Sequence, residues 1–222
     1  MSMIRCSLFA GMVAPVTTLA GSARADFTLN FDNVYNGTSP NGSSPFGSAT
    51  FQSIAPNTVR LTIINGLTGT SPYLAGAYFN VNPTINPSSL SFSFVSGQAV
   101  ESITIGANSV QPPGQGGQFD ILLAYESANN SNRFTAGETS VYTITGTGIT
   151  AETFAFQSQN EANAFYGVIT VRGIPASGGG TASGEVASGN PAAVPEPSSL
   201  ALCGIAGLVG LGIARRRARS RG

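Results

Sequence analysis

The chain has no histidine, lysine or tryptophan, and only two cysteines, Cys6 and Cys203. Without histidine or lysine, it cannot form Ser-His-Asp or Cys-His catalytic sites, Schiff bases or histidine metal sites. No cysteine lies between residues 26 and 193. A domain in this region therefore has no internal disulfide and depends on a packed core.

Positive charge is also scarce in this region. Three arginines, Arg60, Arg133 and Arg172, stand against nine carboxylates, and three minus nine leaves a formal charge of −6. The basic stripe that binds a phosphate backbone is missing. We therefore expect no nucleic-acid partner, and acidic polysaccharides only where divalent cations bridge them.

Residues 1–25 have the pattern of a secretory signal peptide. Arg5 precedes a mostly apolar stretch over residues 8–19, and Ala23 and Ala25 offer small side chains for cleavage after Ala25. The apolar stretch is too short for a permanent membrane helix, which needs about 20 residues. Export is the expected outcome, with residue 26 beginning the mature protein.

Residues 26–175 alternate apolar and polar side chains with a period of two, which is typical of half-buried strands. Turn signals such as Asn-Gly separate these runs. Each such strand has one solvent-exposed face and one apolar face, and a second layer must cover the apolar face. We therefore expect an all-β ectodomain, an antiparallel β-sandwich of jelly-roll-like type. The predicted core residues are Phe31, Leu61, Phe92, Phe94, Ile121, Leu123 and Phe156.

Two segments around the end of this domain differ from the strands. Residues 150–163 have room for one short helical turn, and residues 165–171 are apolar enough for burial on both faces. Residues 176–193 are rich in glycine and serine and are predicted to form a flexible linker. A short strand around residues 184–186 is an alternative that we rank below the linker.

Residues 194–222 have three ordered parts. Val194, Pro195, Glu196 and Pro197 come first, and an apolar run over residues 200–214 follows. As a helix this run is about 22 Å long, a short transmembrane span. The third part is an arginine tail, which by the positive-inside rule marks the cytoplasmic side. Its arginines are Arg215, Arg216, Arg217, Arg219 and Arg221.

This Pro-Glu-Pro, apolar helix and arginine order resembles the PEP-CTERM sorting signal, which exosortases recognise and process. The resemblance implies export through the inner membrane, a transient membrane anchor, cleavage near the Pro-Glu-Pro segment, and delivery to the cell surface or an exopolysaccharide matrix. Glu196 would be a recognition residue for the exosortase. Residues 67–70, 78–83, 133–142 and 171–174 are similar to blocks of exported PEP-CTERM ectodomains of unassigned activity.

Three function classes stay open for the ectodomain. We expect a non-catalytic surface or matrix protein, without cofactor or metal. The alternative is a carbohydrate-binding module, for which Tyr35, Tyr73 and Tyr78 are the aromatic candidates because sugars stack on exposed rings. A glycoside hydrolase, which needs only two carboxylates, is third. Its candidate residues are Asp120, Glu126 and Glu138.

Overall fold

The computed structural model describes residues 26–114, 116–159, 164–189 and 192–194. The predicted signal segment 1–25 and the predicted membrane helix 200–214 lie outside the described residues. Within the described ranges, no helix has the length and apolarity needed to span a bilayer.

Twelve strands and three short 3-10 helices make up the described chain. The strands are β1 (Asp26–Gly37), β2 (Gly47–Ala55), β3 (Thr58–Asn65), β4 (Tyr73–Phe79), β5 (Ser91–Gly97), β6 (Ser102–Val110), β7 (Phe119–Ala124), β8 (Phe134–Thr135), β9 (Thr139–Thr145), β10 (Gly167–Pro175), β11 (Thr181–Ser188) and β12 (Ala192–Val194). The 3-10 helices are η1 (Pro87–Ser89), η2 (Asn130–Asn132) and η3 (Ala151–Phe154). The predicted all-β class is therefore confirmed, and η3 is the helical turn expected within residues 150–163.

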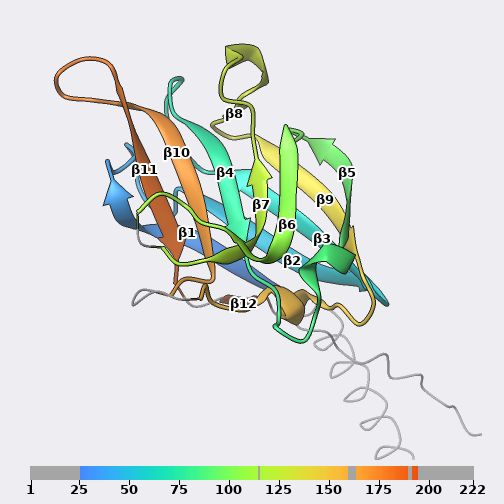
Figure 1. The fold of residues 1–222 in the computed structure, drawn as a ribbon. Coiled ribbons are helices and arrows are strands. Elements are labelled where there is room, and N and C mark those ends of the chain that lie inside the picture. The colour runs from blue at the N-terminus through green and yellow to red at the C-terminus, as the bar shows by residue number, and fades with distance from the viewer. Residues whose placement is uncertain (1–25, 115, 160–163, 190–191, 195–222) are drawn as a thin grey trace, which may run out of the picture.

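All strands belong to one antiparallel sheet in the order β5-β9-β3-β2-β1-β11-β10-β4-β7-β6, with β12 added to β1 and β8 to β4. The sheet curls strongly (Figure 1). Strands β2 and β4 are four positions apart, which in a flat sheet is about 19 Å at the usual strand spacing. The rings of Phe51 on β2 and Phe79 on β4 nevertheless have centroids only 5.3 Å apart. The second layer that half-buried strands need thus comes from the same sheet.

The two ends of the sheet approach each other where β5 leads into β6. The amide of Val100 donates to the Tyr142 hydroxyl on β9 at 2.9 Å, and the amide of Glu101 donates to the Ala124 carbonyl on β7 at 2.8 Å. Residues 98–101 therefore bind strands from both ends of the sheet, and β5 and β6 stand side by side in Figure 1.

The predicted core is correct in four positions and needs correction in three. Phe31, Leu61, Ile121 and Leu123 are buried. Phe92 and Phe156 are half-buried, and Phe94 is 49% exposed. Phe92 and Phe94 lie on β5, which is the last strand of the sheet. A neighbouring strand is present on one side of β5 only, so these side chains are incompletely covered. Phe156 follows η3 in a loop instead of lying on a strand.

The prediction of a linker over residues 176–193 is wrong for most of its length. Strand β11 lies in the middle of the sheet, paired with β1 on one side and β10 on the other. Its residues from Gly184 to Ser188 are all buried. The alternative strand around residues 184–186 is the correct interpretation, because backbone pairing with two neighbours compensates for the small side chains.

Residues 167–171 of strand β10 are buried on both faces, as their continuous apolar sequence predicts. Ile169 belongs to the main core, whereas its neighbour Val168 belongs to a smaller cluster with Tyr78, Phe119 and Ala187. Since successive side chains on a strand point to opposite faces, this second cluster lies on the outer face of the sheet.

Candidate functional site

Four side chains form a row across neighbouring strands at one end of the outer face. Ser183 on β11 is paired with Arg172 on β10, Arg172 with Tyr73 on β4, and Tyr73 with Thr135 on β8. Paired residues of antiparallel strands present their side chains on the same face, so the row forms one continuous surface. We call the hollow that this row lines the arginine pocket.

A β-bulge follows Arg172, which lies on the outer face with Val168 by the ordinary alternation of the strand. The register between β10 and β11 shifts between Arg172 and Ile174, and Gly173 has a φ of 72°. The extra residue leaves Arg172 exposed while Ile174 is buried in the core. A Cβ atom at position 173 would collide with the backbone carbonyl of Ser71, so this bulge requires glycine.

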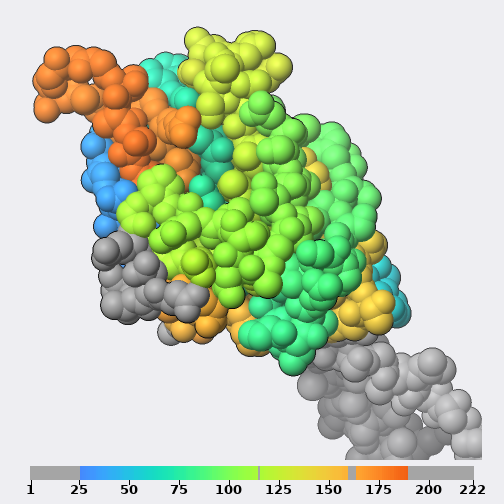
Figure 2. Space-filling model, in the orientation of Figure 1, coloured from blue at the N-terminus to red at the C-terminus, as the bar shows by residue number. Residues whose placement is uncertain are grey.

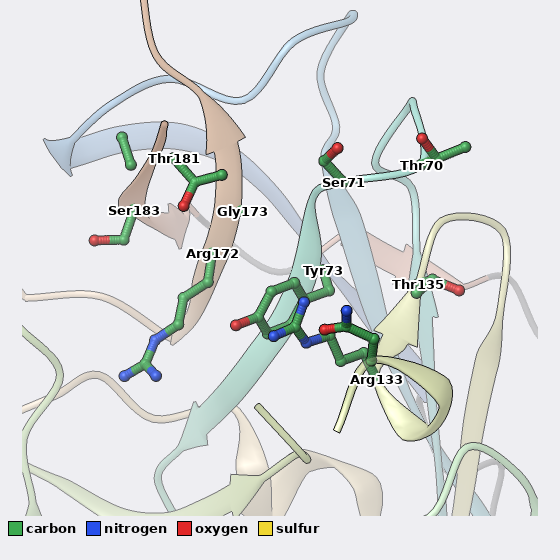
Figure 3. A pocket seen from close by; sticks show the side chains of 11 residues that line it. Thr70, Ser71, Tyr73, Arg133, Thr135, Arg172, Gly173, Thr181 and Ser183 are labelled. Atoms are coloured by element: carbon green, nitrogen blue, oxygen red, sulfur yellow. The ribbon is translucent and has the colours of Figure 1, made fainter. Parts of the chain in front are cut away.

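The arginine pocket has a volume of about 670 Å³. It opens between the β10–β11 hairpin and the segment around η2, where Figure 2 shows a hollow between the orange and yellow-green surfaces. In Figure 3, Tyr73 lies between Arg172 and Arg133. Apart from these three residues and Gly173 the lining is small and mostly polar: Thr70, Ser71, Asn130, Thr135, Thr181, Ala182 and Ser183.

Arg133 is held in place before any ligand binds. Its Nε and Nη2 atoms donate to the Ser127 carbonyl at 3.0 and 2.6 Å. Its guanidinium carbon lies 4.2 Å from the centroid of the Tyr73 ring, a cation–π contact. The carbonyl and the ring together fix the orientation of this side chain.

The three carboxylates considered for hydrolysis each accept hydrogen bonds from nearby backbone. Asp120 accepts from the amides of Val81 and Asn108 at 3.0 and 2.8 Å. Glu126 accepts from the amides of Asn129 and Ala128, and these bonds lower its pKa. Glu138 accepts from the amide and the hydroxyl of Thr135 at 2.6 and 3.0 Å. Glu126 and Glu138 thus stabilise their own loops, whereas Asp120 on β7 links the chain after β4 to strand β6.

The three tyrosines considered for sugar stacking are not flat exposed platforms. Tyr78 is 8% exposed within the outer cluster, and Tyr35 is half-buried with its hydroxyl donating to the Pro113 carbonyl at 3.2 Å. Tyr73 is buried and lies beneath Arg133. Of the three, Tyr73 alone lines the arginine pocket.

Glu185 was missed by the sequence analysis because it fell within the predicted linker. It lies on β11, 2% exposed, and accepts a hydrogen bond of 2.6 Å from the Thr170 hydroxyl on β10. Burial raises the pKa of Glu185 to about 7, although the Thr170 hydrogen bond and the charge of Arg172 oppose the rise. Near neutral pH this carboxyl is therefore partly protonated.

The raised pKa of Glu185 predicts that stability falls as pH rises. In the unfolded chain the carboxyl loses its proton near pH 4.5, whereas in the folded chain it does so near pH 7. Between these values the folded state binds more protons, so the free energy of unfolding decreases, by about 3 kcal/mol in total. The loss begins near pH 4.5 and is complete above pH 7. Thermal unfolding at pH 5 and pH 8 measures it.

Two variants make this measurement specific. Glu185→Gln resembles the protonated carboxyl and should be insensitive to pH over this window, whereas Glu101→Gln, at an exposed site, should keep the wild-type pH dependence. The chain has no histidine to titrate in the same range. A wild-type melting temperature that is equal at pH 5 and pH 8 would contradict the assignment.

The predicted sorting residues begin at the edge of the described fold. Val194 is the last residue of β12 and pairs with Asp26, the first residue of β1. Pro195, Glu196, Pro197, Arg215, Arg216, Arg217, Arg219 and Arg221, and also Ala23 and Ala25 of the predicted signal cleavage site, lie outside the described residues. The fold thus presents the start of the sorting segment directly beside the first strand of the domain.

Comparison with known families identifies this segment. A family model described as the PEP-CTERM protein-sorting motif matches residues 193–218. No curated protein matches the chain. A motif of this kind implies processing by an exosortase and export to the cell envelope or surface. The chain therefore carries a PEP-CTERM protein-sorting motif, joined without a long linker to a domain built from one curled antiparallel sheet.

Proposed function

We propose that this protein is a non-catalytic component of the cell surface or extracellular matrix, held for a time by a membrane helix over residues 200–214 and then released by an exosortase. In this proposal residues 1–25 are the signal peptide, and the curled sheet is an ectodomain of jelly-roll-like sandwich type. The observation that carries it is the sorting motif at residues 193–218, which begins within the last strand of the folded domain.

The position of β12 sets how closely the domain approaches the membrane. Only residues 195–199 separate Val194 from the apolar run that begins at residue 200. Five fully extended residues span at most about 18 Å. Pro195 and Pro197 restrict their own backbone and that of their neighbours to extended geometry. The exosortase would thus meet a short, stiff strand between a folded domain and the bilayer.

Replacement of Pro195, Glu196 and Pro197 by alanine tests the sorting proposal. In a cell with a matching exosortase, the wild-type protein should leave the inner membrane without its C-terminal helix. The triple variant should be exported but stay in that membrane at full length, because the processing enzyme no longer recognises it. Fractionation and mass spectrometry of the surface material measure both results.

A matched control removes two prolines elsewhere. The double variant Pro112→Ala, Pro113→Ala changes an ectodomain loop and should be sorted like the wild type. Intact Arg215, Arg216 and Arg217 on the released wild-type protein would show that the helix is a plain anchor and would refute the proposal.

Carbohydrate binding is the second candidate function, and the arginine pocket is the observation that favours it. The pocket lies within the 300 to 1,000 Å³ that is typical of small-ligand sites. Its hydroxyl and amide groups suit the hydroxyl groups of a sugar. Hydrolysis is the weakest candidate, because Asp120, Glu126 and Glu138 each already accept hydrogen bonds from backbone amides.

A further inference from the structure

We propose that the arginine pocket binds the carboxylate group of an acidic sugar, such as a uronic acid unit of a matrix polysaccharide. This inference rests on the carbohydrate-binding candidate above. It goes further by assigning the chemical class of the ligand and the side chains that select it, Arg172 and Arg133.

The arginine pocket is lined by positive charge, which is scarce in the rest of the domain. Of the three arginines between residues 26 and 193, two line this one hollow, and no carboxylate lines it. The formal charge of −6, which led us to expect acidic polysaccharides only through bridging cations, therefore does not describe the local surface. An anionic group that enters the hollow meets the guanidinium groups that line it, whereas Glu185, the carboxyl that interacts with Arg172, is buried and does not line the hollow.

Both arginines have donors left for a ligand. Within the part of the chain that the structure describes, the Arg172 side chain has neither a hydrogen bond nor an ion pair. Arg133 uses Nε and Nη2 on the Ser127 carbonyl, which leaves Nη1 without a hydrogen bond among the described residues. A guanidinium group has five N–H donors in a planar fork that matches a carboxylate. Because Arg133 is already oriented, its contact with a ligand costs little side-chain entropy.

The remaining lining favours a sugar acid over a nucleic-acid phosphate. Hydroxyl groups of Thr70, Ser71 and Thr181 and the amide of Asn130 surround the arginines, and they can bond to several ligand hydroxyls. A polynucleotide needs a row of cations along its backbone, whereas this pocket has two and the chain around it is acidic. The pocket therefore fits one anionic group with polar neighbours.

Binding of a defined pair of oligosaccharides tests the inference. The full chain in mild detergent is titrated by calorimetry with a galacturonic acid tetramer and with the same tetramer after its carboxylates have been reduced to alcohols. The acidic tetramer should bind at least tenfold more tightly than the reduced one. Arg172→Gln should weaken binding of the acidic tetramer at least tenfold, and Arg133→Gln should also weaken it.

The control variant is Arg60→Gln, which removes the one remaining arginine of the domain at an exposed site on β3. It should bind the acidic tetramer like the wild type, and melting temperatures should show that all three variants are folded. Equal binding of both tetramers would overturn carboxylate recognition and leave carbohydrate binding intact. Binding of neither tetramer would overturn both. Tighter binding of a single-stranded oligonucleotide, lost in Arg172→Gln, would identify a phosphate site instead and overturn the inference.

Discussion

A chain that ends after Pro175 is expected not to fold. Without β11, strand β10 keeps β4 but loses its other partner along its whole length, and β1 loses the pairing of residues Phe31 to Gly37. The sheet then separates into β5-β9-β3-β2-β1 and β10-β4-β7-β6. The buried side chains of Val186 and Ala187 are lost with it. Far-UV circular dichroism and thermal unfolding of residues 26–175 should show no cooperative transition.

The control for this truncation is a chain of residues 26–194. It lacks the rest of the sorting motif but retains β11 and β12, and it should unfold cooperatively. If residues 26–175 melted like residues 26–194, β11 would be dispensable and the linker interpretation would have to be restored.

Phe51→Ala is expected to lower the free energy of unfolding by about 3 to 5 kcal/mol, the usual range for truncating a buried phenylalanine. Phe51 is 0% exposed. Its ring stacks on Phe27 and Phe154, with centroids at 5.1 and 4.8 Å, and meets the ring of Phe79 edge-on. Because Phe79 lies on the opposite wall of the curled sheet, the cavity would weaken the contact between the two walls. Urea unfolding measures the change.

Phe94→Ala is the matched control, since it makes the same substitution at a site that is 49% exposed. It should cost about 1 kcal/mol or less, because most of the ring is already in water. Similar losses for Phe51→Ala and Phe94→Ala would show that the Phe94 ring is buried in solution and would contradict its exposed position.

The contrast between these two residues also shows where sequence patterns stop being informative. Alternation correctly placed Phe31 and Leu61 in the core, because β1 and β3 are interior strands with one face covered. Strand β5 has the same alternation, but it lies at the end of the sheet. Its position depends on which strands pair, and the local sequence does not contain that information.

Strand β11 was missed for a related reason. Its glycine, serine and alanine content is typical of a linker, yet small residues are what the centre of this sheet requires. A Cβ atom on Gly184 would collide with the backbone carbonyl of Thr38. The amino-acid composition of a segment indicates how much side-chain surface it can bury. Strand β11 is instead stabilised by the close approach of its backbone to those of β1 and β10.

The sorting motif could be recognised from the sequence, whereas the arginine pocket could not. The motif is contiguous, so its residues could be recognised directly, and the family match confirms it. Arg133 and Arg172 are far apart in the sequence and line the same pocket only because β8 and β10 both pair with β4. The average charge of the domain even argued against an anionic ligand. Sites assembled by strand pairing leave no local pattern.

The central place of β11 also fixes when the domain can form. Strand β1 is the first strand of the domain to be synthesised, and its inner neighbour β11 is the eleventh of twelve. Until residue 188 has passed through the export channel, β1 and β10 each lack a neighbour, so the two halves of the sheet cannot join. We therefore expect the chain to cross the membrane unfolded and to complete its sheet outside. By then only the segment that exosortase recognises and the residues behind it remain to be delivered.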